Sequence, residues 1–271
     1  MVNAFSFCLY GGENPKYYQG LLENIALIGR YFPAWKVYIY YAPDVSEEML
    51  KHLSACTSVV LRPTNEYGAI NMIHRFYAID EAEVDVMMVR DADSRVHWKD
   101  RWAIREFVAS NYNAHTIRDN IEHTACMMGG LWGIKKAAQI NMHSEYVQFK
   151  NNPNEKHGMG HDQNFLQECI YPKVRPTLLV HYSNGRARLG EIAVEFPFDW
   201  TNDVYCGRVE LEYLDYPEPP IKRRFGFPTA LVRVRDAISA PVAAPAPPPE
   251  AVLPTMVPTP NLPILNFLHR K

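Results

Sequence analysis

Two carboxylates follow an apolar stretch in the first half of the sequence. Asp91 and Asp93 come directly after residues 84–89, an apolar run that predicts a buried strand. Because side chains alternate along extended backbone, both carboxylates should point to one side at the strand's carboxyl end, where open α/β sheets bind ligands. Carboxylate oxygens suit Mn²⁺ or Mg²⁺, and such an ion would neutralise the charge of a departing diphosphate. The alternative is a polar turn after a buried strand.

A polar stripe is expected on the helix predicted over residues 69–79. Asn71, His74 and Arg75 have the i, i+3, i+4 spacing that places side chains on one face of an α-helix, and the other residues are mostly apolar. Arg75 could then bind phosphate through its guanidinium fork. A stripe that faces solvent is the alternative.

Two further segments contain residue types found at active sites. Gly129 and Gly130 interrupt a strand-like run over 126–134, which indicates either the close approach of a ligand or a bulge. Asp162 and Gln163 open an amphipathic helix predicted over 162–170. There Asp162 is either a general base or charge-stabilising carboxylate, or a plain helix cap. His181 ends a strand predicted over 177–181 and is either a metal ligand or a core histidine.

The elements that carry these residues alternate between strand and helix up to about residue 130. Strands are predicted over 5–10, 37–41, 58–61, 84–89 and 115–118, with helices opening at Asn14 and Ser46 and covering 98–108. A helix over 135–149 and a short element over 204–213 complete the series. The pattern predicts an α/β fold, a mostly parallel sheet flanked by helices in a single domain over residues 1–236.

The last residues, 237–271, differ from the rest in composition. Nine prolines fall between residues 240 and 263, which predicts an extended linker followed by a short tail. The tail is either a docking segment or the start of further domains beyond the linker.

Composition and charge exclude several classes of function. The net charge of −2 gives no general attraction to nucleic acid, and we expect no membrane span because no apolar run approaches about 20 residues. The N-terminus does not resemble a signal peptide. Five scattered cysteines without a Cys-x-x-Cys pair fit reduced thiols, so we expect a cytoplasmic protein.

Taken in order, these motifs resemble the GT-A class of nucleotide-sugar glycosyltransferases. The resemblance covers about the first 213 residues. The matching segments are Leu9-Tyr10-Gly11, Ala42-Pro43-Asp44, the Arg75 helix, Asp91-Ala92-Asp93, Gly129-Gly130-Leu131-Trp132-Gly133 and His161-Asp162-Gln163. The run from Ile117 to Asn120, with the glycine and Asp-Gln segments after it, is similar more narrowly to capsid glycosyltransferases of large algal viruses, which implies a host cytoplasm.

The resemblance implies a UDP-sugar donor and a glycan or glycoprotein acceptor, with possible retention at the anomeric carbon. Asp91 and Asp93 would hold Mn²⁺ or Mg²⁺, with His181 as a third ligand that matches the family motif only loosely. Asp162 and Gln163 would form the catalytic pair. The implied donor-binding residues are Leu9, Tyr10, Gly11, Asp44, Arg75, Asp91, Gly129 and Gly130.

Three other functions compete with this one. A sugar nucleotidyltransferase needs a basic, glycine-rich loop for a triphosphate, and Gly11-Gly12 is followed by no lysine or arginine in that turn. An aspartyl phosphotransferase also places Asp-x-Asp after a strand, but Ser94-Arg95 fits it poorly. A non-catalytic module that binds carbohydrate or a nucleotide-sugar has no counter-argument in the sequence.

Overall fold

A nine-stranded sheet runs through the protein, which is analysed as a computed structural model that describes residues 1–151, 160–183, 186–197, 204–209 and 232–233. The strand order is β3-β2-β1-β4-β6-β5-β7-β8-β9. Five pairings are parallel and three, β4 with β6, β5 with β6 and β8 with β9, are antiparallel. The strands are β1 Val2–Leu9, β2 Lys36–Tyr41, β3 Val59–Pro63, β4 Val84–Val89, β5 Ala114–Arg118, β6 Trp132–Lys135, β7 Leu178–Tyr182, β8 Ile192–Glu195 and β9 Val232–Arg233.

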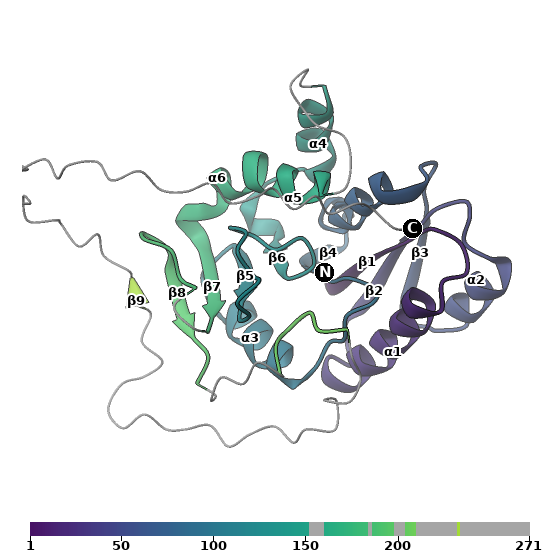
Figure 1. Cartoon of the computed structure of the whole chain (residues 1–271), viewed down its shortest axis with the longest axis horizontal. Coiled ribbons are helices and arrows are strands. Elements are labelled where there is room, and N and C mark those ends of the chain that lie inside the picture. The colour runs from purple at the N-terminus through teal and green to yellow at the C-terminus, as the bar shows by residue number, and fades with distance from the viewer. Residues whose placement is uncertain (152–159, 184–185, 198–203, 210–231, 234–271) are drawn as a thin grey trace, which may run out of the picture. The chain divides into compact units, whose positions relative to one another are not determined.

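Helices cover both faces of the sheet (Figure 1). Apolar side chains of α1, α2 and α3 pack on one face, and those of η1, α4 and α5 pack on the other. The predicted fold class, an α/β domain with a mostly parallel sheet flanked by helices, is confirmed. The helices are α1 Pro15–Tyr31, α2 Glu47–Ser54, η1 Gly68–Asp80, α3 Trp98–Ala109, η2 Lys136–Ala138, α4 Met142–Lys150, α5 His161–Phe165, η3 Leu166–Ile170, α6 Tyr171–Val174 and η4 Arg175–Thr177.

The first helices begin where the sequence predicts. Asn14 caps α1 by accepting a hydrogen bond from the Lys16 backbone N–H, and Ser46 caps α2 through the Met49 N–H. These caps satisfy amide donors that a helix leaves free in its first turn. They fix α1 directly after the turn that follows β1, so the helix starts at the carboxyl edge of the sheet.

The second half departs from prediction in several places. The strand predicted over 126–134 is wrong for residues 126–131, which form a loop before β6. The helix predicted over 135–149 is also wrong for its first part, because η2 and a break precede α4. Strand β8 was not predicted. Residues 204–209 form neither helix nor strand, and the rest of the element predicted up to 213 lies outside the described residues.

The helix that carries Arg75 is a 3₁₀ helix rather than an α-helix. With three residues per turn, Asn71 and His74 fall in line, and Arg75 points about 120° away. The predicted shared face is therefore wrong. His74 bonds Glu66 at 2.9 Å, whereas Asn71 bonds the Cys8 thiol and Arg75 turns toward Asp91.

The chain divides into two units, residues 1–236 and 237–271. The predicted proline-rich linker lies outside the described residues, so its extended form stays a prediction. Among the described helices, none combines the length and the apolar character that a membrane span requires.

Candidate functional site

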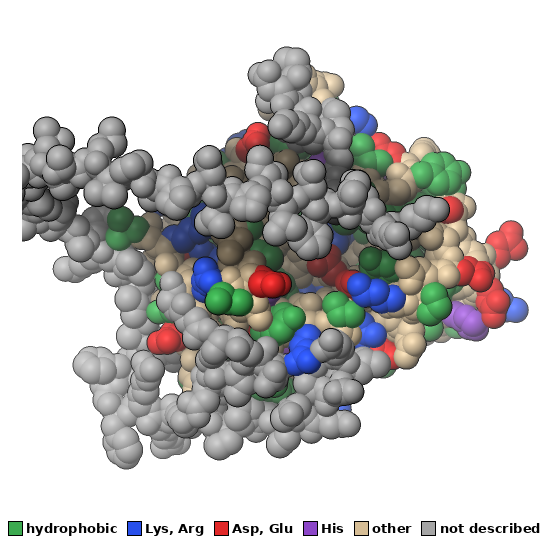
Figure 2. All heavy atoms as spheres, in the orientation of Figure 1, with side chains coloured by type: hydrophobic (Ala, Val, Ile, Leu, Met, Phe, Trp, Pro, Cys, Tyr) green, Lys and Arg blue, Asp and Glu red, His purple; other side chains and the backbone are tan. Residues whose placement is uncertain are grey.

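A cleft of about 340 Å³ lies where β1 and β4 end side by side. Parallel pairing brings the residues after both strands to one edge, so Tyr10 and Gly11 meet Asp91 and Asp93 there. On the face shown in Figure 2, acidic and basic side chains lie next to each other. The lining residues are Cys8, Leu9, Tyr10, Gly11, Asn14, Tyr17, Met72, Arg75, Asp91, Ala92 and Asp93.

Arg75 joins two carboxylates from different parts of the chain. Its Nη1 donates to Oδ1 of Asp91 at 2.5 Å, and its Nη2 donates to Oδ2 of Asp162 at 2.9 Å. The arginine is 5% exposed. Burial alone would lower the pKa of Arg75, but Asp91 and Asp162 outweigh it and raise the pKa above its ordinary value. The guanidinium is therefore a fixed cation that holds Asp91 and Asp162 on either side of it.

Asp162 lies in the first turn of α5, as predicted, but it does not cap the helix. The N-cap is Gly160, whose φ of +83° is in the left-handed region, and the cap makes no side-chain hydrogen bond. The carboxylate of Asp162 instead accepts the hydrogen bond from Arg75. The Asp162 side chain is therefore positioned by its bond to Arg75 and not by a capping bond at the start of the helix.

The loop before β6 is held against this group. Gln163 Oε1 accepts a hydrogen bond from the Gly129 N–H at 2.9 Å, and its Nε2 donates to the Met127 carbonyl. A side chain at Gly130 would collide with Asp91, because a Cβ there would lie 2.5 Å from the Asp91 Cγ. Of the two readings of the glycines, close approach applies at Gly130, where the loop backbone packs directly on a carboxylate of the site.

Asp93 is a further carboxylate of the cleft, and it forms an ion pair with Lys16, a residue that was not predicted to belong to the site. Lys16 Nζ lies 2.7 Å from Asp93 Oδ2, and the lysine side chain is 49% exposed. The hydrogen bond to Asp93 raises the pKa of Lys16. The cap at Asn14 was the available signal, because a helix that starts at this edge must place its first side chains beside the ends of the strands.

The carboxylate oxygens of the cleft are suitable ligands for a hard divalent cation. Asp91 keeps Oδ2 free of Arg75, and Asp93 is held only by a half-exposed lysine that a metal could displace. Mg²⁺ and Mn²⁺ commonly take one or two protein carboxylates and fill their other positions with phosphate oxygens and water. Asp91 and Asp93 would therefore hold the ion.

Asp44 does not line the cleft itself, but it stabilises the turn after β1, which does. Its Oδ2 accepts a hydrogen bond from the Gly11 N–H at 3.1 Å, and Gly11 has a φ of +86°. Burial raises the pKa of the neighbouring Tyr10 to about 12, so its hydroxyl stays protonated and available as a donor. Leu9, Tyr10, Gly11 and Asp44 are thus brought together.

The structure does not bring His181 to this cleft. Its ring is fully buried against α3, with Nδ1 at 2.7 Å from His115 Nε2 and Nε2 at 3.1 Å from Glu106. Burial lowers the pKa of His181, although Glu106 opposes the shift. Both ring nitrogens are engaged within the core, so His181 is left out of the candidate metal site.

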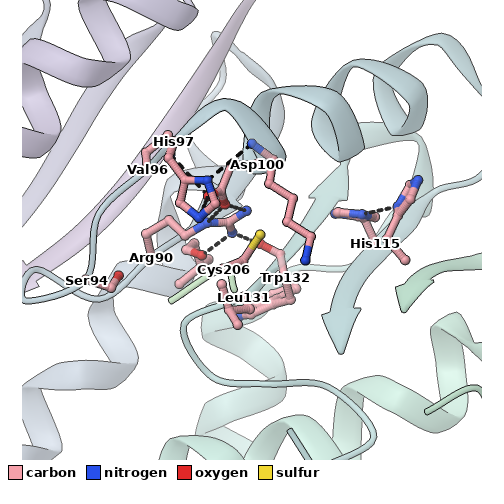
Figure 3. Close-up of polar contacts among 12 residues, drawn as sticks. Arg90, Ser94, Val96, His97, Asp100, His115, Leu131, Trp132 and Cys206 are labelled. Atoms are coloured by element: carbon pink, nitrogen blue, oxygen red, sulfur yellow. Dashed lines mark hydrogen bonds and ion pairs between the residues drawn. The ribbon is translucent and has the colours of Figure 1, made fainter. Parts of the chain in front are cut away.

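A separate cluster of His97, Asp100 and Cys206 has the ligand types of a metal site. Their donor atoms lie within 4.8 Å of one another, the single such group of three in the part of the chain that the structure describes. Figure 3 shows Arg90 pointing at Asp100, which it bonds at 2.9 Å. Burial raises the pKa of Cys206 well above its ordinary value. The Arg90 guanidinium already binds the Asp100 carboxylate and opposes a second cation beside it, so we assign the cluster a structural role.

Comparisons with known proteins were made on sequence and on structure. No protein-family model and no curated protein matches the sequence. Solved structures that the chain is similar to include a glycosyltransferase involved in glycosylation of the major capsid of PBCV-1, at 11% identity and a TM-score of 0.43. That match covers 66% of this chain and 81% of the other.

Two further solved structures illustrate the range of matches. One is 4-diphosphocytidyl-2C-methyl-D-erythritol synthase from Anaerococcus prevotii, at 7% identity and a TM-score of 0.44, covering 68% of this chain and 88% of that one. The other is a mannosyltransferase from Pyrobaculum calidifontis in complex with GDP-Man and Mn²⁺, at 11% identity and a TM-score of 0.39, covering 50% and 45%. Glycosyltransferases are thus among the matches, as the motifs predicted. At these identities the function has to be argued from the site.

Proposed function

We propose that this chain is a glycosyltransferase that moves a sugar from a nucleoside-diphosphate sugar, with UDP as the nucleotide, to a glycan or glycoprotein acceptor. The observation that carries the proposal is the pairing of one buried arginine, Arg75, with Asp91 and Asp162. This pairing holds two carboxylates on either side of one fixed cation at the carboxyl edge of the sheet. In the proposal, Asp91 binds the metal and Asp162 faces the sugar.

The donor would occupy the cleft between β1 and β4. Leu9, Tyr10 and Asp44 would contact the nucleoside, and Asp91 and Asp93 would hold Mn²⁺ or Mg²⁺ against the diphosphate. The ion supplies positive charge where the leaving diphosphate gains negative charge. Arg75 is engaged by two carboxylates in this structure, so we give it a positioning role beside the phosphates rather than a free phosphate-binding fork.

The sugar would lie between Asp162 and the loop at Gly129. As the bond from the anomeric carbon to the diphosphate oxygen breaks, positive charge develops on the sugar, and the Asp162 carboxylate is placed to stabilise it. The acceptor hydroxyl oxygen then bonds the anomeric carbon, and its proton passes to the oxygen of the leaving diphosphate. Gln163 positions this side of the site by holding Gly129 and Met127. The Asp162-Gln163 pair is typical of the retaining enzymes that the chain resembles, so we propose that the configuration at the anomeric carbon is retained.

A sugar nucleotidyltransferase is the second candidate, and the charges of the cleft argue against it. A nucleoside triphosphate needs several free cations. Arg75 is already paired with two carboxylates, so a metal that displaces Lys16 from Asp93 would free a single lysine beside the cleft. A non-catalytic binding module would hold the same donor without turning it over.

One experiment separates the three candidates. The protein is incubated with a panel of nucleotide-sugars and Mn²⁺, and released nucleoside diphosphate is measured; parallel reactions with nucleoside triphosphates and sugar 1-phosphates are measured for pyrophosphate. We expect nucleoside diphosphate with a UDP-sugar and none with excess chelator. Pyrophosphate alone would identify a nucleotidyltransferase. Binding without release of either product would identify a binding module.

A further inference from the structure

A second pocket, of about 200 Å³, is lined by three arginines. Its lining consists of Arg118, His123, Thr124, Arg186, Ala187 and Arg188. This lining contains no carboxylate. It differs in this from the cleft between β1 and β4, called the donor cleft below, where cations and carboxylates are matched. The function proposed above makes no use of this pocket.

Arg118 is the most unusual member of the pocket. It ends β5, is 1% exposed, and donates from Nη2 to the buried Glu191. Its Nε and Nη1 are buried and have no hydrogen-bond partner among the described residues. Buried donors almost always find an acceptor because an unmet one is costly. Two unmet donors on one guanidinium that lines a pocket indicate an acceptor that binds there.

The charges around Arg118 leave the pocket positive. Glu191 is the nearby counter-ion, and it also accepts hydrogen bonds from the Tyr171 hydroxyl at 3.0 Å and from the Arg188 backbone N–H at 2.8 Å. The Arg188 side chain donates to the Thr124 carbonyl, a neutral group. Arg186 makes no ion pair or side-chain hydrogen bond within the described residues. Asp119 lies 3.3 Å from His123 of the lining, but Lys99 balances its charge at 2.7 Å. One carboxylate, Glu191, is thus set against the three guanidinium groups.

The pocket opens at the same edge of the sheet as the donor cleft. Arg118 ends β5 beside Tyr182 of the parallel strand β7, and in the strand order β4-β6-β5 only β6 separates β5 from β4 (Figure 1). Two strand spacings place the end of β5 about 10 Å from the end of β4. The loop between β5 and β6 spans the interval, with Thr124 at the arginine pocket and Gly129 beside Asp162.

Both sites also lie on the same face of the sheet. Ala114 of β5 belongs to the apolar cluster beneath η1, α4 and α5, and Arg118 points to that same side because side chains alternate along a strand. η1 and α5 carry Arg75 and Asp162. A ligand that extends from the sugar site along the β5–β6 loop would therefore reach the three arginines.

We propose that Arg118, Arg186 and Arg188 bind an anionic group, phosphate or carboxylate, carried by the acceptor glycan about one or two sugar units from the hydroxyl that is glycosylated. Planar guanidinium groups match the oxygens of both anions. The identity of the ligand as acceptor rests on the proposed function, whereas the binding of an anion at this pocket does not.

The test measures binding by NMR without any nucleotide-sugar. Glucose 6-phosphate, methyl glucuronide and neutral methyl glucoside are titrated at constant ionic strength, and the amide shifts of Thr124, Ala187 and Arg188 are followed. Arg186→Ala is the main variant because its side chain has no partner to lose among the residues that the structure describes. Arg105→Ala on α3, which removes an exposed arginine elsewhere, is the matched control.

We expect saturable shifts with at least one anionic sugar and none with methyl glucoside. Phosphate or carboxylate is then chosen by which anion binds more tightly. Arg186→Ala should weaken that binding about threefold to tenfold, which is modest because the side chain is partly exposed, and Arg105→Ala should leave it unchanged. The proposed anion site would be refuted if methyl glucoside caused equal shifts. It would also be refuted if Arg186→Ala and Arg105→Ala weakened anion binding equally.

A second variant tests the buried arginine without leaving a lone charge. Arg118→Gln with Glu191→Gln replaces the ion pair by two neutral amides, and its Tm is checked first. Loss of anion binding in a folded double variant supports the proposal, whereas retained binding overturns it. Failure of the donor assay with intact anion binding would refute the proposed function but keep the anion site. Release of nucleoside diphosphate in the donor assay without anion binding would support the proposed function and refute the anion site.

Discussion

The substitution Gly130→Ala tests whether the loop before β6 sets the position of Asp91. Gly130 has an ordinary backbone conformation, so alanine introduces no backbone strain. The added methyl group would lie 2.5 Å from the Asp91 Cγ and 2.9 Å from its Oδ1. Asp91 must move, and movement breaks its bond to the buried Arg75.

The expected cost follows from two opposing effects. Forcing a side chain out of a packed position costs about 1–3 kcal/mol, and replacing glycine by alanine stabilises by about 0.4–1 kcal/mol through the unfolded chain. The net loss is about 1–2 kcal/mol, which for a domain of this size lowers Tm by about 2–8 °C. If Asp91 holds the metal, displacing it by about 1 Å should lower kcat/KM about 100-fold.

Two glycines serve as graded controls. A Cβ at Gly29 in α1 would meet no atom within 4 Å, so Gly29→Ala should raise stability by about 0.5–1 kcal/mol. A Cβ at Gly129 would lie 3.1 Å from Asp162 Oδ2 and 3.4 Å from Arg75 Nη2, and both groups can yield slightly. Calorimetry on the three variants should therefore rank Gly29→Ala above Gly129→Ala and Gly130→Ala last.

A double variant identifies Asp91 as the cause. In an Asp91→Ala background the collision is absent, so adding Gly130→Ala should leave Tm unchanged or raise it. The reasoning is wrong if Gly130→Ala has the wild-type Tm, or if its loss of stability is the same with and without Asp91.

Four further outcomes are expected. Asp162→Asn should lower kcat about 100-fold with donor affinity nearly unchanged, because the charge on the sugar develops only in the transition state; a near-native kcat would make Asp162 structural. Asp93→Ala should abolish metal-dependent turnover and change Tm little, since its exposed partner Lys16 contributes at most about 1 kcal/mol; turnover in excess chelator would contradict this. Burial, with repulsion from His181 and Arg90, holds the pKa of His115 well below its ordinary value, so the unfolded chain binds a proton first and stability falls by up to about 1.4 kcal/mol per unit as pH drops below about 6.5. Urea titrations should show a smaller loss for His115→Phe. Ending the chain after Asp236 should leave Tm unchanged, and a large fall would show that residues 237–271 pack on the domain.

Local sequence signals predicted most of the first half of the fold. The apolar run at 84–89 gave β4 with its exact ends, and Asn14 and Ser46 marked the helix starts, because these features depend on neighbours in the sequence. The mistake at 126–131 has a physical cause. Met127 and Leu131 are buried like strand residues, but they pack from a loop that Gln163 holds through Gly129 and Met127.

The arrangement of the site was predictable only in part. Alternation along a strand was enough to expect Asp91 and Asp93 at the carboxyl edge of the sheet, whereas Tyr10 was expected in the site through the family resemblance. The bond from Arg75 to Asp162 joins residues 87 positions apart, and that of Arg118 to Glu191 spans 73. Such pairs depend on how distant elements pack, and a histidine such as His181 can be a core residue or a ligand with the same local sequence.

The 3₁₀ form of η1 has a consequence for anyone who engineers this protein for heat resistance. At the ideal rise its 13 residues would span about 26 Å as a 3₁₀ helix, against about 20 Å as an α-helix. Surface substitutions to strong α-formers usually stabilise a helix. Here they would favour a shorter, rewound segment and rotate Arg75 away from both carboxylates, so thermostability gained in η1 would come at the expense of the site.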